Sequence, residues 1–349
     1  MSKKDESAHI LVIRLSALGD VAMLAPVILG LVAKYPSLRL TVLTKRQFAP
    51  IFEGIPNVEV HTADVKKRHK GLMGLWRLYK ELEKLKVTGV ADLHNVLRSQ
   101  VLKKYFLLSG IPFQQIDKGR KEKRALTKGK EDAFKPLKPT HQRYADVFSV
   151  LDFPIDLREV QLLKRQPLSD KLLNLVQQDS KKWVGIAPFA AHEGKMFSLS
   201  SMEKVISTLN DTNKYKIILF GGGEQEIIHL DRLAQEKTNI VNVAGKLSLS
   251  EELILISNLD VMVSMDSGNA HLAANYGIPV ITLWGVTHPY AGFYPFDQPM
   301  ENALLSDREQ FPLIPTSVYG NKVPKGYEKV MESISVEEVI AKINALLVS

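Results

Sequence analysis

The sequence of 349 residues contains no cysteine. This absence excludes a disulfide framework, a thiolate zinc site, an iron–sulfur cluster and a cysteine nucleophile. No run of apolar residues approaches the roughly 18 that a helix needs to cross a bilayer. The first residues lead directly into an apolar run at 10–13, without the hydrophobic region of a signal peptide. We therefore expect a cytoplasmic protein.

Acidic residues are scarce in one half of the chain. Residues 1–160 hold 29 Lys and Arg against 17 Asp and Glu, whereas residues 161–349 hold 17 against 21. A basic half attracts nucleic acid, an anionic membrane or an acidic substrate, unless its lysines are merely solvated. The basic runs lack a recognised nucleic-acid motif and interleaved aromatic residues, so we do not expect nucleic acid as the partner.

Short β-branched runs alternate with stretches of helical periodicity along most of the chain. In the first half, runs at 10–13, 40–43 and 89–93 alternate with helix-like stretches at 21–35 and 74–86. The strands expected in the second half cover 183–187, 216–220, 240–243, 261–263 and 279–283. This alternation predicts an α/β protein with two doubly wound parallel sheets.

The predicted organisation has three parts. Residues 1–165 should form an N-terminal Rossmann-like domain, and residues 166–334 a C-terminal one. Residues 335–349 should form a final helix, opened by a capping box, which packs back on the first domain. Residues 112–139 break the periodicity and are expected to form a long loop or a partly helical flap. Ligands of such sheets bind at the carboxyl ends of the strands, which predicts a cleft between the two halves.

The first segment with possible chemistry follows the first strand, at Arg14-Leu-Ser-Ala-Leu-Gly-Asp20. Gly19 allows a tight turn and a close approach of backbone to ligand. Asp20 stands near a helix start, where it is either an N-cap or a general base facing the cleft. With one suitable glycine, the segment does not match a dinucleotide-binding fingerprint.

Three further segments follow strands of the second half. Asp266-Ser-Gly-Asn-Ala-His271 opens a helix, where backbone N–H groups and Gly268 suit a diphosphate, while Asp266 suits sugar or ribose hydroxyls. Lys195 lies in a loop, where it is either solvated or a cation for a leaving phosphate. The glycines at 221–223 are a weak signal for a nucleotide. His271 has no second histidine at metal spacing, so no metal site is expected.

Together these segments resemble glycosyltransferase family 9, the ADP-heptose:lipopolysaccharide heptosyltransferases. The residues that carry the resemblance are 13–20, 92–99, 141–144, 195, 221–224, 266–274 and 283–289. The resemblance implies a GT-B fold, with two Rossmann-like domains facing each other across a cleft. It also implies inverting, metal-independent transfer of a sugar, with a nucleotide sugar (ADP-heptose) as co-substrate and no other cofactor. The implied acceptor is an anionic glycolipid of the lipopolysaccharide inner core.

The resemblance also assigns roles to residues. Asp20 matches the general base, and Ser16 and Gly19 lie on the same loop near the phosphates. The residues implied in donor binding are Lys195, Gly222, Glu224, Asp266, Ser267, Gly268, His271 and Thr287. The residues expected to bind the acceptor are Lys66, Lys67, Arg98, Arg120, Arg124 and Arg143.

Several alternatives stay open at this stage. Many family members have Thr hydroxyls shortly before the donor lysine, where this chain has Phe189-Ala-Ala-His192, so the donor sugar is open. Another GT-B enzyme, such as a nucleotide-sugar 2-epimerase, or a non-catalytic glycan-binding protein would share the fold. Peripheral contact with the inner membrane, helped by Leu72, Leu75 and Trp76, is a further expectation.

Overall fold

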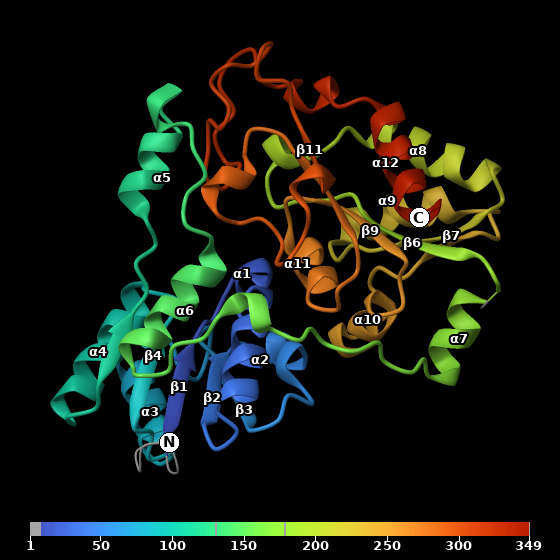
Figure 1. The fold of residues 1–349 in the computed structure, drawn as a ribbon. Coiled ribbons are helices and arrows are strands. Elements are labelled where there is room, and N and C mark those ends of the chain that lie inside the picture. The colour runs from blue at the N-terminus through green and yellow to red at the C-terminus, as the bar shows by residue number, and fades with distance from the viewer. Residues whose placement is uncertain (1–7, 130, 178, 349) are drawn as a thin grey trace. The chain divides into compact units, whose positions relative to one another are not determined.

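The computed structural model describes residues 8–129, 131–177 and 179–348, and its chain divides into two compact units (Figure 1). The first unit comprises the residues up to Lys118 together with Thr140–Leu162. The second comprises Gly119–Pro139 and the residues from Leu163 onward. The segment 119–139, which we expected in the N-terminal domain, thus belongs to the second unit.

The first unit is built on a five-stranded, all-parallel sheet in the order β3-β2-β1-β4-β5. Its strands are β1 (His9–Ile13), β2 (Arg39–Thr44), β3 (Val58–Thr62), β4 (Gly89–Asp92) and β5 (Phe113–Gln115). Its α-helices are α1 (Leu18–Ala22), α2 (Ala25–Lys34), α3 (Gly71–Glu83), α4 (Leu97–Leu108) and α6 (Thr140–Val150). Strand β1 is buried along its whole length, as its near-continuous apolar sequence predicts for a central parallel strand.

The helix predicted at 21–35 is two helices. Helix α1 ends at Ala22 and α2 begins at Ala25, with Pro26 in its first turn. Proline is favoured there because it has no N–H and its fixed φ suits a helix start. The short α1 therefore belongs to the loop that carries Asp20.

The second unit has a six-stranded parallel sheet in the order β11-β10-β9-β6-β7-β8. Its strands are β6 (Lys182–Ala187), β7 (Tyr215–Leu219), β8 (Ile240–Asn242), β9 (Val261–Met265), β10 (Val280–Trp284) and β11 (Ala303–Leu305). Its α-helices are α5 (Arg120–Leu126), α7 (Asp170–Val176), α8 (Leu199–Asp211), α9 (Glu224–Ala234), α10 (Leu249–Ile256), α11 (Gly268–Ala274) and α12 (Val336–Val348). No helix in the described ranges is long and apolar enough to span a bilayer.

The final helix, α12, packs on the core of the second unit. The capping box is present: Ser335 and Glu338 each accept a hydrogen bond from the other's backbone N–H. Val339 and Ile343 are fully buried in the core of this unit, and the helix lies against α8. Its apolar stripe is therefore used inside the second unit.

The segment 119–139 is partly helical, as expected, and is fastened to the second unit by cation–π contacts. The Lys123 ammonium lies 3.8 Å from the centroid of the Phe293 ring. The Arg308 guanidinium lies 3.3 Å from that of Phe134. These contacts explain why the segment groups with the second unit, although the chain enters and leaves it from the first.

Each sheet has one point at which the strand order reverses. In the first sheet this point lies between β1 and β4, and in the second between β6 and β9. The loops that follow two such strands run to opposite sides of the sheet, which makes this the usual binding position in open α/β sheets. The residues after these four strands are therefore where function is expected.

Candidate functional site

In the first unit, Arg14 and Asp20 form an ion pair on the loop after β1. The guanidinium is 7% exposed and the carboxylate 28% exposed. A second N–H group of Arg14 donates to the backbone oxygen of Leu93, 2.6 Å away, in the loop after β4. The arginine thus ties the two loops of the switch point together and holds the Asp20 carboxylate between them.

The capping interpretation of Asp20 holds only in part. Asp20 is the third residue of α1, and its Oδ2 accepts a 3.3 Å hydrogen bond from the N–H of Ala17. The contact with Arg14 falls on the same oxygen. Among the described residues no hydrogen bond or ion pair falls on Oδ1. Ser16 and Gly19 lie on the same loop, half-buried.

Tyr144 supports this loop from α6. Its hydroxyl donates to the backbone oxygen of Asp20 at 3.1 Å, and its ring centroid lies 5.9 Å from the Arg14 guanidinium. Burial raises the pKa of Tyr144 above its ordinary value, so the hydroxyl keeps its proton and remains a donor. The sequence placed Tyr144 in a family segment without assigning it this task.

The loop after β4 is shaped by Asp92, which is fully buried. One carboxylate oxygen accepts from the N–H groups of His94 at 3.0 Å and Asn95 at 2.9 Å. The other accepts from the Gln115 side chain at 2.7 Å. Asp92 therefore builds the turn, and the turn brings His94 to the carboxyl edge of the sheet.

The six residues expected to bind the acceptor lie on different elements, four of them in the first unit and two in the second. Lys66 and Lys67 are exposed on the loop between β3 and α3, and Arg98 is exposed at the start of α4. Arg143 is only 5% exposed and donates to the backbone oxygen of Asp117 at 3.3 Å, so it is engaged in holding the fold. Arg120 and Arg124 lie on α5, which belongs to the second unit.

In the second unit, Lys195, Asp266 and Thr287 meet directly at the switch point. The Lys195 Nζ lies 2.8 Å from Oδ2 of Asp266, and the Thr287 hydroxyl donates to the same oxygen at 3.0 Å. The side chains of Lys195 and Asp266 are 13% and 9% exposed. Three residues that the sequence assigned to the donor thus form one cluster, drawn from the ends of β6, β9 and β10.

Two glycines allow the Lys195 loop to pack closely. A Cβ on Gly285 would lie 2.3 Å from the backbone oxygen of Gly194. A Cβ on Gly320, whose φ is +85°, would lie 2.3 Å from the Lys195 side chain. A larger residue at Gly320 would displace the Lys195 side chain, and one at Gly285 would displace the backbone of Gly194.

The remaining donor residues lie on two helix starts of this unit. Ser267 precedes α11, and its hydroxyl lies 3.0 Å from that of Ser264, while Gly268 begins the helix and His271 is buried in it. Gly222 precedes α9 and donates its N–H to Oε2 of Glu226 at 2.8 Å.

Glu224, which was expected to bind the nucleotide-sugar donor, is exposed at the first position of α9. Glu226, two residues further on, accepts hydrogen bonds from the N–H groups of Gly222 and Gly223, and the sequence analysis did not predict this contact. A glutamate at the third position of a helix is the signal that would have found it.

Among the described residues no group of three or more His, Asp or Glu side chains is placed to hold a metal ion. The metal-independent reaction stays a prediction.

Comparison with known proteins identifies the family. The pattern of glycosyltransferase family 9 (heptosyltransferase) matches residues 75–311. The lipopolysaccharide core heptosyltransferase OpsX of Haemophilus influenzae is 25% identical over 365 aligned residues, which cover 96% of each chain. Lipopolysaccharide heptosyltransferase 1 of Campylobacter coli is 24% identical over 80% of this chain and 85% of its own.

Solved structures agree with this assignment. A family 9 glycosyl transferase from Veillonella parvula superposes with a TM-score of 0.75 at 20% identity, over 98% of this chain and 97% of its own. The E. coli ADP-heptose lps heptosyltransferase II superposes with a TM-score of 0.68 at 20% identity, over 97% and 98%. The two all-parallel α/β units are thus those of the GT-B fold. Since the family pattern spans most of the chain, this protein belongs to glycosyltransferase family 9, the heptosyltransferases.

Proposed function

We propose that this enzyme transfers heptose from ADP-heptose to an anionic acceptor in the lipopolysaccharide inner core, with inversion at the anomeric carbon. The relatives over nearly the whole chain are named as lipopolysaccharide heptosyltransferases. A solved family member was captured with ADP-2-deoxy-2-fluoro heptose. The observation that carries the proposal is the ion pair of carboxylate and cation at the switch point of each unit.

These two ion pairs supply the groups that a single displacement requires. Asp20 takes the proton of the acceptor hydroxyl while the oxygen of that hydroxyl forms a bond to the anomeric carbon. The bond from the anomeric carbon to the diphosphate breaks in the same step. The charge that develops on the departing diphosphate is stabilised by Lys195 and by the N–H groups at the start of α11. Asp266 holds Lys195 until the donor binds and then accepts hydrogen bonds from donor hydroxyls. No metal or other cofactor takes part in this proposal.

The donor is tested by thermal unfolding in the presence of ADP-, UDP-, GDP- and CMP-sugars. A ligand at 100 times its Kd stabilises the protein by about 2.7 kcal/mol. We expect this shift with ADP-heptose and a much smaller one with the other nucleotides. The anomeric configuration of the product, read by NMR, should be inverted. A UDP-sugar as the stabilising ligand, a retained configuration, or donor turnover without acceptor would each contradict the proposal.

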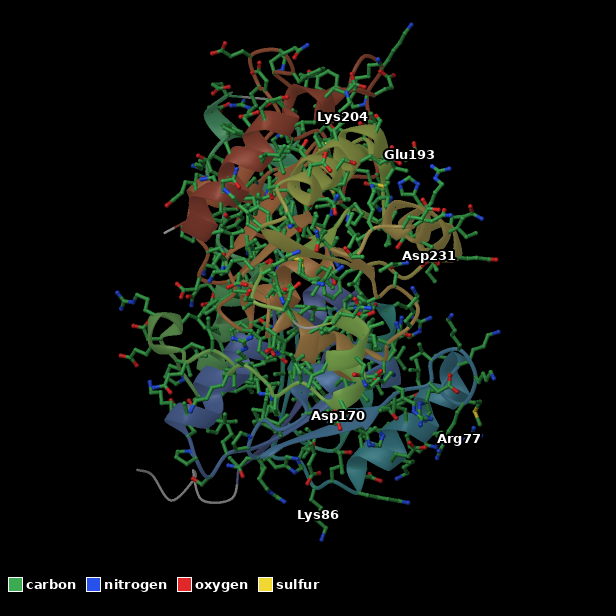
Figure 2. The ribbon with its side chains drawn as sticks, turned by 90° about the vertical axis from the view of Figure 1, so that its right-hand side faces the viewer. Arg77, Lys86, Asp170, Glu193, Lys204 and Asp231 are labelled. Carbon is green, nitrogen blue, oxygen red and sulfur yellow. The ribbon has the colours of Figure 1, made fainter. Side chains whose placement is uncertain are left out.

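The proposed acceptor is a membrane lipid, and α3 offers a face for the cytoplasmic surface of an anionic membrane. Leu72, Met73 and Trp76 are 68%, 78% and 42% exposed on its first two turns, while Leu75 is buried. Residues 65–80 contain six Lys or Arg and no Asp or Glu. One of these, Arg77, is visible at the surface in Figure 2. Exposed apolar residues ringed by cations bind interfaces that carry negative charge.

The test of this face is sedimentation with vesicles. Replacing Leu72, Met73 and Trp76 with serine should weaken binding to phosphatidylcholine vesicles containing phosphatidylglycerol roughly tenfold or more. Binding of the unmodified protein should decline as salt rises. Ile228→Ser removes a side chain that is 57% exposed on α9 and serves as the matched control. Equal binding of the triple variant and this control would refute the contact.

A further inference from the structure

The imidazole of His94 is buried and lacks a hydrogen-bond partner among the described residues. The side chain lies two residues beyond the end of β4 and is 8% exposed. The backbone of His94 is fixed by Asp92, but within the described residues its ring forms no hydrogen bond, and Nδ1 is buried without a partner. Buried polar atoms are nearly always paired, so an unpaired ring at the carboxyl edge of a sheet needs an explanation.

The surroundings of His94 keep its ring uncharged. Burial lowers its pKa to about 3, and the positive charges of Arg14 and Lys118 act in the same direction against an opposing effect of Asp20. At neutral pH the ring therefore carries one N–H donor and one bare nitrogen acceptor. A ring with so low a pKa is a weak base near neutral pH and suits hydrogen bonding better than proton transfer.

His94 lies at the same switch point as Asp20, the proposed catalytic base. Its loop follows β4, and the loop of Asp20 follows β1, so the two residues flank the same switch point. Arg14 bonds to Leu93, the residue before His94, and also to Asp20. The Nε of Arg14 is itself buried without a partner. Two buried nitrogens therefore lack a partner here: Nδ1 of His94 and Nε of Arg14, the arginine that pairs with Asp20.

We propose that His94 is a positioning residue for the acceptor, whose uncharged imidazole hydrogen-bonds a sugar hydroxyl next to the hydroxyl that Asp20 deprotonates. An uncharged ring suits this task because a hydroxyl is both donor and acceptor, whereas the neighbouring arginines select anionic groups. The hydroxyl would supply the partner that the ring lacks. This inference rests on the proposed function, since it takes Asp20 as the base.

The test compares His94→Leu, which removes the hydrogen-bonding atoms, with His94→Gln, which restores a donor and an acceptor. We expect His94→Leu to raise the acceptor KM about tenfold, with a smaller change in kcat and an unchanged donor KM. His94→Gln should recover part of the loss. Because His94 does not titrate near neutrality, the acid limb of the pH profile of kcat/KM should not move in either variant.

The control is His9→Gln. His9 is 5% exposed, sits at the opposite, amino end of β1, and is bonded to Thr41 and Leu85. This variant should lower the thermal stability without changing the acceptor KM. An unchanged acceptor KM in His94→Leu, a raised donor KM, or a shifted acid limb would overturn the proposal.

Two further measurements keep the inference separable from the function on which it rests. The first uses acceptors that each lack one hydroxyl. One of them should bind the unmodified enzyme about tenfold more weakly than the complete acceptor does. His94→Leu should bind this acceptor and the complete one equally well. If no single deoxygenation weakens binding, the inference is wrong. Acceptor affinity is also measured on the Asp20→Asn background. There the effect of His94 persists even if Asp20 proves not to be the base.

Discussion

Asp20→Asn is expected to lower kcat by about 10² to 10⁴-fold, the usual contribution of a positioned general base. Asparagine keeps the size of the side chain and can still accept from Ala17, but it cannot take the proton of the acceptor hydroxyl. Donor affinity should stay nearly unchanged, because the residues expected to bind the donor lie on the second unit. Initial rates of product formation, together with thermal shifts by the donor, measure the two effects separately.

Asp156→Asn is the matched control. Asp156 also pairs with an arginine of the first unit, Arg158, but lies outside both switch-point loops. Its substitution should leave kcat unchanged. If Asp20→Asn retained the rate of this control, Asp20 would have no part in the reaction, and another group would have to accept the proton.

The fold could be predicted where burial leaves a strong pattern. Central strands such as β1 and β9 are buried along their length and consist almost wholly of apolar residues. Exposed edge strands carry little of this signal. Strands β3, β5 and β11 are at most partly buried, and none of the three was predicted. The edge strand β8, which is mostly buried, was predicted. Pattern alone predicted α12 and its capping box but not its contact with α8, because a buried stripe does not reveal which surface will cover it.

The candidate site could be predicted in its chemistry but not in its pairings. Asp20, Lys195 and Asp266 follow buried strands, where parallel sheets place functional groups. The contacts that hold the Asp20 loop join residues distant in sequence: Arg14 donates a hydrogen bond to Leu93, and Tyr144 donates one to the backbone of Asp20. Such pairs depend on strand order, which sequence periodicity does not encode. For the same reason the basic residues of α5 were expected in the wrong unit.

Lys195→Met is expected to lower kcat by about 10² to 10³-fold, because the developing charge on the diphosphate loses the cation that we propose stabilises it. The same change should weaken the donor-induced thermal shift. It should also destabilise the free protein, since the Asp266 side chain is 9% exposed and would be left with Thr287 as its remaining partner. Removing one member of a buried ion pair costs more than removing both.

The double variant Lys195→Met/Asp266→Asn separates these two effects. It should regain thermal stability relative to Lys195→Met, because no buried charge is left unpaired, yet it should not regain turnover. Lys204→Met removes an exposed lysine of α8, labelled in Figure 2, and should change neither quantity. If the ion pair between Lys195 and Asp266 had only a structural role, the double variant would regain activity together with stability. Recovery of stability without activity would instead show that the loss of turnover in Lys195→Met does not follow from its instability.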